Sequence, residues 1–150
     1  MINFKIILNV LGYLLVALSI LLIVPIIIDL ISGNGSWKSF LISLIITLGF
    51  GVTFLLSTRN ELKNKILTQD AFLITTLSWI FISIFGALPF FFLDSSLSLT
   101  NSIFESMSGI TTTGSTIFNE VENLPQGILI WRSILQWVGG VGIILSLIHI

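Results

Sequence analysis

The sequence contains no cysteine, and charged residues make up only 9% of its 150 residues. Without cysteine the chain can form neither a disulfide nor a thiolate metal site, and it has no cysteine nucleophile. Its net charge is −1 and no basic run occurs, so we expect no nucleic-acid partner. With 55% hydrophobic residues and a mean hydropathy of +1.11, the composition excludes an ordinary soluble domain and predicts an all-α membrane protein surrounded by the lipid bilayer.

Four apolar segments are long enough to cross a bilayer, which takes about 20 residues in a helix. They cover residues 6–31, 39–58, 71–93 and 127–150. The first is uncharged from Ile6 to Ile28 and lacks a small-residue cleavage pattern, so we interpret it as a retained span rather than a signal peptide. We expect a kink at Pro25, and close helix packing at Gly49 and Gly51.

A segment too short and too polar to cross the bilayer separates the third and fourth spans. Residues 98–110 can form a helix of about three turns, with Thr100 or Asn101 as its cap and Gly109 at its end. Residues 111–116 then read Thr-Thr-Thr-Gly-Ser-Thr. Because irregular backbone at membrane depth is tolerated only where it packs in protein or lines a wet cavity, we predict a re-entrant loop.

The Thr-rich stretch has the chemistry of a cation filter. Backbone carbonyls can replace the hydration shell of a cation, and Gly114 can adopt the unusual backbone angles that turn carbonyls one way. The neighbouring hydroxyls add oxygen atoms without a charge, and the C-terminal end of the short helix carries a partial negative charge that favours a cation. The residues alone also fit an ordinary extracellular loop, so both interpretations stay open at this point.

One charge lies inside the last span. Arg132 is about 7–8 Å along this helix at 1.5 Å per residue. Its side chain can snorkel to the headgroups, or it can brace the re-entrant segment by pairing with Glu105 or with carbonyls at the end of the short helix. Further along, Gly139, Gly140 and Gly142 offer a close-packing face or a hinge.

The sequence offers no catalytic set. Ser106, Ser108 and Ser115 lack the histidine, lysine or aspartate arrangement that activates a serine nucleophile. His149 is the single histidine, and no metal or catalytic partner is visible for it. We therefore expect that the protein is not an enzyme and has no covalent cofactor, which disfavours an intramembrane enzyme.

The basic residues predict an orientation in the membrane. Four of the six would share one side: Lys5, Arg59, Lys63 and Lys65. The positive-inside rule makes this side cytoplasmic, so the N-terminus is expected inside and the re-entrant loop enters from outside. Asp94, Glu120 and Glu122 would then raise the local cation concentration at the outer mouth.

Several motifs occur here in a characteristic order. They are Glu105 to Thr116, Leu124-Pro125-Gln126-Gly127, and Trp131-Arg132-Ser133 with Gln136 to Gly142. Before them stand Leu77-Ser78-Trp79 and Gly86-Ala87-Leu88-Pro89. Together these residues resemble the first pore repeat of TrkH-type potassium uptake proteins, of the Trk/Ktr/HKT superfamily, over residues 70–144. The resemblance favours the filter over the ordinary loop.

The resemblance implies an N-terminal transmembrane helix pair over residues 1–65 and one helix–re-entrant pore loop–helix repeat, of a four-repeat potassium channel-like fold, over residues 66–150. The repeat would comprise a span at 71–93, a pore helix at 98–110, a filter at 111–116 and an incomplete second span at 127–150. The filter would bind K+ through Thr112, Thr113, Gly114 and Ser115, with the ion at the first three. Its supporting residues would be Thr111, Thr116, Glu105 and Arg132.

The same resemblance implies potassium uptake across the bacterial inner membrane, with K+ as the transported ion. Family proteins carry four such repeats in one chain, form homodimers and bind a cytoplasmic nucleotide-binding regulatory subunit. Because one repeat is present here, we expect the N-terminal piece of a larger protein, with the remaining three pore repeats as its partners. The alternative is a non-transporting membrane scaffold or regulatory fragment that associates with full-length relatives.

Overall fold

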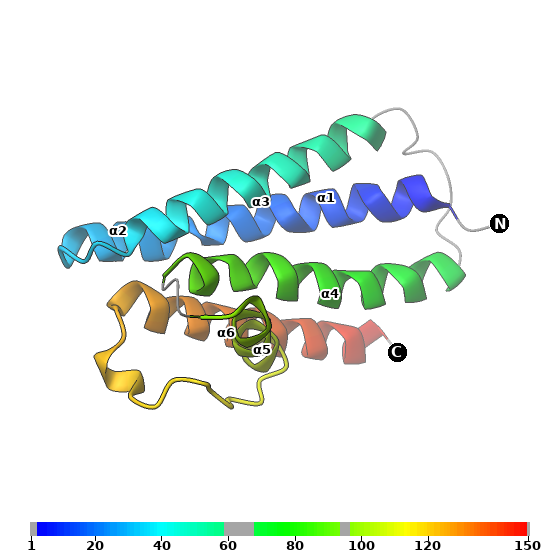
Figure 1. The fold of residues 1–150 in the computed structure, drawn as a ribbon. Helices are drawn as coiled ribbons and strands as arrows, with labels where there is room; N and C mark the ends of the chain where they lie inside the picture. The colour runs from blue at the N-terminus through cyan, green and yellow to red at the C-terminus, as the bar shows by residue number, and fades with distance from the viewer. Residues whose placement is uncertain (1–2, 59–67, 94–96, 150) are drawn as a thin grey trace.

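The computed structural model describes residues 3–58, 68–93 and 97–149, and all regular structure within these ranges is helical. The elements are α1 (Phe4–Leu21), α2 (Ile23–Ile31), α3 (Trp37–Thr58), α4 (Thr68–Leu93), α5 (Leu99–Ile110), the single 3-10 turn η1 (Val121–Asn123) and α6 (Gln126–His149). In Figure 1, α1, α3, α4 and α6 run lengthwise beside one another, whereas the short α5 is seen nearly end-on. The predicted all-α architecture is confirmed.

The first apolar segment forms two helices rather than one. Pro25 has no N–H to donate to the carbonyl of Leu21, and its ring crowds that carbonyl, which explains why the helix breaks at Leu22. The break changes the neighbours of the segment: α1 packs against α3 and α4, whereas α2 packs against α3 and α6. The expected kink at Pro25 is therefore present about one turn earlier in the chain.

Helices α1 and α3 approach closely where glycines face each other. A Cβ on Gly51 would lie 2.9 Å from Val16 Cγ2, and a Cβ on Gly12 would lie 3.1 Å from the carbonyl oxygen of Gly51. At the far end of the pair, the side-chain amide of Asn9 donates to the Thr58 hydroxyl at 2.8 Å. The expectation for Gly49 was wrong, because no atom lies within 4 Å of a Cβ built there.

Helix α4 continues through Pro89 to Leu93. Pro89 removes one backbone hydrogen bond of its own helix. One turn earlier, the indole N–H of Trp131 donates to the carbonyl oxygen of Gly86 at 3.0 Å. The hydroxyl of Ser39 likewise donates to the carbonyl of Phe92 at 2.9 Å. The last turns of α4 are thus tied to both α6 and α3.

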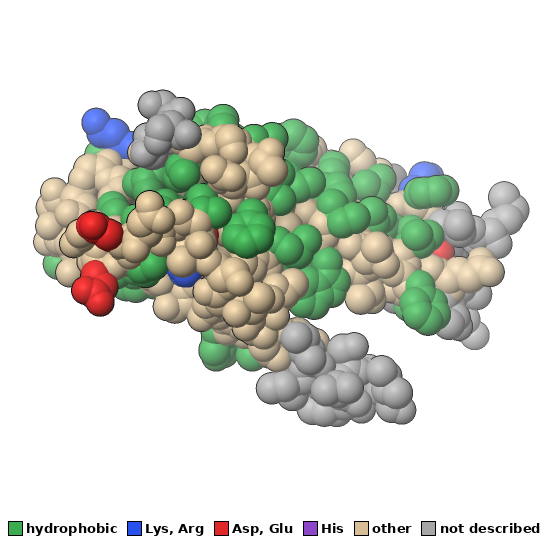
Figure 2. Space-filling view, turned by 60° about the horizontal axis from the view of Figure 1, so that its bottom comes forward, with side chains coloured by type: hydrophobic (Ala, Val, Ile, Leu, Met, Phe, Trp, Pro, Cys, Tyr) green, Lys and Arg blue, Asp and Glu red, His purple; other side chains and the backbone are tan. Residues whose placement is uncertain are grey.

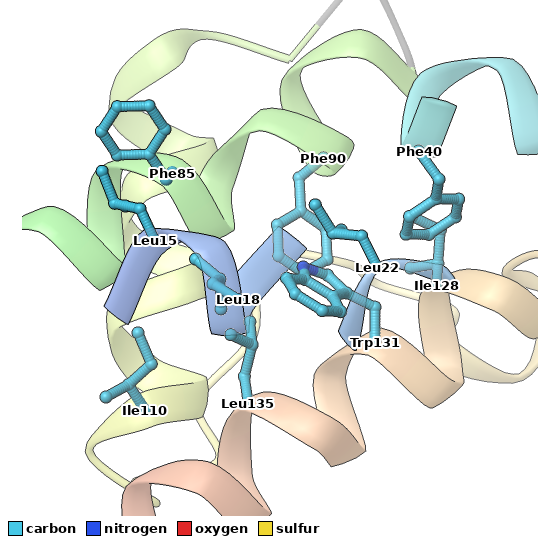
Figure 3. Close-up of a cluster of buried hydrophobic side chains, with 10 residues drawn as sticks. All are labelled: Leu15, Leu18, Leu22, Phe40, Phe85, Phe90, Ile110, Ile128, Trp131 and Leu135. Atoms are coloured by element: carbon cyan, nitrogen blue, oxygen red, sulfur yellow. The ribbon is translucent and has the colours of Figure 1, made fainter. Parts of the chain in front are cut away.

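One hydrophobic core joins the N-terminal helices to the rest of the chain (Figure 3). Trp131 of α6 is completely buried and meets the ring of Phe40 of α3 edge-on, with ring centroids 6.5 Å apart. The buried members of this core are Leu15, Leu18, Leu22, Phe40, Phe85, Phe90, Ile110, Ile128, Trp131 and Leu135. The helix pair therefore packs directly against the segment that carries the loop. The division at residue 65 stays a prediction.

The outer surface is that of a membrane protein. Among the described residues, three helices are long and apolar enough to cross a membrane: Phe4–Ile31, Trp37–Thr58 and Gln69–Leu93. Apolar side chains cover much of the face shown in Figure 2. Helix α6 is not among these three, because its last residues lie outside the part of the chain whose side chains are described, and its crossing stays a prediction.

The orientation also stays a prediction. Three of the basic residues on which it depends, Arg59, Lys63 and Lys65, lie outside the described residues.

The glycine contact between α1 and α3 gives a stability test. Replacing Gly51 with leucine should force the two helices apart at Val16 and lower the free energy of unfolding by about 1–3 kcal/mol. Gly49→Leu is the matched control, because that position is exposed and open. Thermal unfolding in detergent measures both, and equal melting temperatures for the two variants would contradict the packing described.

Candidate functional site

Helix α5 begins at Leu99, one residue after the predicted start, and has a different cap. The hydroxyl of Ser98 accepts the backbone N–H of Asn101 at 3.2 Å, so Ser98 is the N-cap, and the expectation of Thr100 or Asn101 was wrong. Gly109 was expected to end the helix, but it lies inside it. A Cβ there would lie 3.1 Å from Leu135 Cβ, so this glycine permits close packing on α6.

The C-terminal end of α5 lies against the middle of α6. A Cβ on Gly139 would overlap the carbonyl oxygen of Ile110, so only glycine allows this approach. Gly139 is about 20 Å along α6 from Gln126, at 1.5 Å per residue. The expected close packing therefore occurs at Gly139. A Cβ built on Gly140 would have one atom at 4.0 Å, and a Cβ built on Gly142 would have none within 4 Å.

Residues 111–116 leave the helix as irregular, exposed backbone. Gly114 has φ 79°, in keeping with the unusual backbone angles expected there, and Thr112 also has positive φ, 57°. Such a conformation is uncommon for a non-glycine residue. The backbone N–H groups of Thr113 and Gly114 both donate to the carbonyl of Ser108, at 3.1 and 3.4 Å. The loop is thus folded back on the end of α5.

The carbonyl oxygens of the loop differ in their partners. The Ser115 carbonyl accepts the hydroxyl of Ser108 at 2.6 Å. Among the described residues, no hydrogen bond uses the carbonyl oxygens of Thr112, Thr113 or Gly114. Three successive carbonyls are therefore available as acceptors, and the fourth already has one donor.

A buried carboxylate connects the loop to both helices. The side chain of Glu105 is 1% exposed and lies 2.8 Å from the guanidinium Nη1 of Arg132. It also accepts the Thr116 hydroxyl at 3.1 Å and the backbone N–H of Ile117 at 3.0 Å. Arg132 donates in addition to the Thr116 hydroxyl at 2.9 Å. Arg132 therefore points inward to Glu105 instead of snorkelling.

These contacts define the path of the loop. Ile110 lies at the level of Gly139, whereas Thr116 lies at the level of Arg132, about 10 Å nearer the start of α6. The chain therefore enters as α5, turns near the middle of α6 and climbs back toward its start. This is the geometry expected of a re-entrant segment.

Helix α4 supports α5 from its other side. A Cβ on Gly86 would lie 2.7 Å from the hydroxyl oxygen of Ser106, so a side chain at Gly86 would displace this hydroxyl. The hydroxyl of Ser83 contacts the sulfur of Met107 at 3.3 Å. Helix α5 is therefore held between α4 and α6.

The charges around the loop are few. Glu120 and Glu122 are exposed in the segment that follows it. Asp94, the third expected acid, lies outside the described residues. Within the described residues no group of three His, Cys, Asp or Glu side chains could hold a metal ion.

Some residues of the site were not found from the sequence. Thr112 in a left-handed conformation has no sequence signal, since threonine rarely adopts it. Asp29, fully buried in α2, accepts the backbone N–H of Gly127 at the start of α6 at 2.7 Å. An isolated acid in an apolar span was the available signal for Asp29.

Comparison with known proteins places this geometry in a family. Residues 36–147 match the family model TrkH, described as a cation transport protein. The chain is 40% identical over 149 residues to the Trk system potassium uptake protein TrkH of Halomonas elongata. It is 36% identical over 149 residues to the protein of the same name from Escherichia coli. In both cases the match covers 99% of this chain and 31% of the relative, so the chain spans about a third of the length of these relatives.

The fold also matches a solved structure. The crystal structure of the potassium transporter TrkH from Vibrio parahaemolyticus superimposes with a TM-score of 0.84 at 34% sequence identity. The match covers 95% of this chain and 31% of that one.

The Glu105–Arg132 pair gives a test of the brace. Arg132→Gln leaves the buried carboxylate without its counter-charge, and we expect a loss of about 3 kcal/mol in the free energy of unfolding. In Glu105→Gln/Arg132→Gln both charges are absent, and we expect most of that loss to be recovered. Thermal unfolding measures both, with Lys38→Gln as the control at an exposed cation. Additive losses in the double variant would contradict the pairing.

Proposed function

The chain belongs to the TrkH family of cation transport proteins, and from this premise we propose that residues 98–116 form one pore loop of a protein that takes up potassium across the membrane. The relatives named above are potassium uptake proteins, that is, transporters rather than enzymes. No covalent cofactor belongs to this function, and K+ is the transported ion. The chain contributes one of four such loops.

One observation carries the proposal. Three successive carbonyl oxygens, those of Thr112, Thr113 and Gly114, have no hydrogen-bond donor among the described residues. The residues that carry them are exposed on the surface of the chain. In a bilayer such groups are costly unless something satisfies them. A cation that has lost its hydration shell satisfies carbonyl oxygens and is itself satisfied by them. The remaining three pore repeats would complete the ring of carbonyls around the ion.

The four filter residues have unequal roles in this proposal. Thr112, Thr113 and Gly114 supply carbonyl oxygens directly. Ser115 shares its carbonyl with the hydroxyl of Ser108, so it would add only its second lone pair. The positive φ of Gly114 turns the peptide without a Cβ penalty.

The supporting residues keep this backbone in place. The hydroxyls of Thr111 and Thr113 are 2.8 Å apart, which links the two sides of the turn. Thr116 is held between Glu105 and Arg132, so the end of the loop cannot drift away from α6. Because the ion pair is buried and neutral overall, it would fix the loop without placing a trapping charge on the ion path.

The rest of the assembly follows as part of the same proposal. The protein would lie in the bacterial inner membrane with its N-terminus in the cytoplasm and the loop entering from outside. It would act as a homodimer with a cytoplasmic nucleotide-binding regulatory subunit. Glu120 and Glu122 would attract cations to the outer mouth, and the C-terminal end of α5 would favour a cation beyond the filter.

Gly114→Asp tests the filter directly. The substitution strains the backbone and adds a charge beside the carbonyls, so we expect potassium-limited growth and rubidium uptake to fall at least about tenfold. The assay uses a bacterium lacking its own potassium uptake systems. This host carries a chimaera in which residues 1–150 replace the matching segment of the Vibrio parahaemolyticus transporter.

Gly33→Asp is the matched control, because Gly33 also has positive φ and open space around it but lies in the turn after α2. Full transport by Gly114→Asp would sink the filter proposal. If the unsubstituted chimaera does not transport although the chain alone co-purifies with a full-length relative, the scaffold alternative is supported instead.

A further inference from the structure

Helix α6 begins without a cap of its own. The first four N–H groups of any helix lack partners inside it. The residue before Gln126 is Pro125, which has no side-chain acceptor, and the first turn of α6 contains no acid. The carbonyl of Pro125 accepts the N–H groups of Ile128 and Leu129, but not that of Gly127. The start of α6 therefore needs an acceptor from elsewhere in the chain.

Asp29 supplies this acceptor. Its carboxylate accepts the N–H of Gly127 at 2.7 Å from a completely buried position in α2. A Cβ on Gly127 would collide with the carboxylate, so this close contact requires glycine at position 127. The other carboxylate oxygen of Asp29 has no hydrogen-bond partner among the described residues. The positive end of the α6 dipole offsets the unfavourable burial of this charge.

A second contact joins the same two elements. The hydroxyl of Ser32, directly after α2, donates to the side-chain oxygen of Gln126 at 2.6 Å. The break at Leu22 is what aims α2 at α6, since α1 packs on α4 instead. The first two residues of α6 are thus both held by the end of the first apolar segment.

The position of the start of α6 along the helix axis determines the axial positions of the residues that hold the loop. Arg132 lies less than two turns further on, and Gly139 two turns beyond it. Arg132 binds Glu105 and Thr116, and Gly139 receives Ile110. A shift of α6 along its axis would therefore move both supports of the loop together.

We propose that Asp29 is a positioning residue for the filter loop: by capping α6 at Gly127, it makes the N-terminal helix pair set the axial position of Arg132 and hence the geometry of residues 111–116. This inference rests on the proposed potassium function for its transport readout. The cap itself does not depend on that function and can be tested separately.

The transport test compares variants of Asp29 in the same chimaera with the Vibrio parahaemolyticus transporter, in the same potassium-uptake-deficient bacterium. With Asp29→Ala the loop spends less time in the binding-competent geometry, so the half-saturating K+ concentration should rise about fivefold. The maximal rate per molecule in the membrane should change less. Asp29→Asn should recover part of the loss, because an amide oxygen can still accept the N–H of Gly127.

Ser36→Ala is the control. Like Asp29, Ser36 has a buried polar atom, but its hydroxyl, just before α3, has no hydrogen-bond partner among the described residues. An Asp29→Ala protein at wild-type membrane level with an unchanged half-saturating concentration would overturn the proposal. So would an equal loss in Asp29→Asn and Asp29→Ala.

The cap has its own readout, which does not depend on transport. Gly127→Ala should lower the melting temperature by colliding with Asp29, and Asp29→Ala/Gly127→Ala should melt higher than Gly127→Ala alone. If the double variant melts no higher than Gly127→Ala alone, the cap is refuted. If the rescue is seen but Gly114→Asp still transports fully, only the filter proposal is refuted.

Discussion

The structure of the loop depends on the carboxylate of Glu105. Residues 111–116 form no helix or strand, so their backbone cannot hold itself in place by a regular hydrogen-bond pattern. Glu105 replaces that pattern with contacts to Thr116, Ile117 and Arg132 from one buried point. In a medium of low dielectric constant such bonds are strong, and an unpaired member would be very costly. The loop, α5 and α6 consequently behave as one unit.

Close approach between backbones is the second requirement. Gly139 lets the carbonyl end of α5 rest on α6, Gly86 lets α5 rest on α4, and Gly51 lets α1 rest on α3. In lipid, helices gain little from hiding apolar surface from one another, so close packing and hydrogen bonds between them decide how they associate. Trp131 combines both, because it fills the core and also donates to the Gly86 carbonyl.

The sequence was informative where a signal is local and limited where it depends on neighbours in space. The apolar runs predicted the long helices, and the polar Thr-rich interruption predicted the re-entrant loop with unusual backbone angles at Gly114. The pairing of Arg132 with Glu105 could be proposed because a charge in an apolar helix needs a partner. The positive φ of Thr112 and the inward position of Gly109 could not, because both follow from how α5 meets α6. The same holds for Asp29, whose partner is 98 residues away.

That separation has a consequence for biogenesis. A ribosome adds about 5–20 residues per second, so Gly127 is synthesised about 5–20 s after Asp29 has left the peptidyl-transferase centre. During this interval the first hydrophobic segment must enter the translocon with an acid that has not yet met its partner. The nascent chain is therefore obliged to keep this end near the lipid headgroups, or inside the insertion machinery, until α6 emerges and the carboxylate can be enclosed.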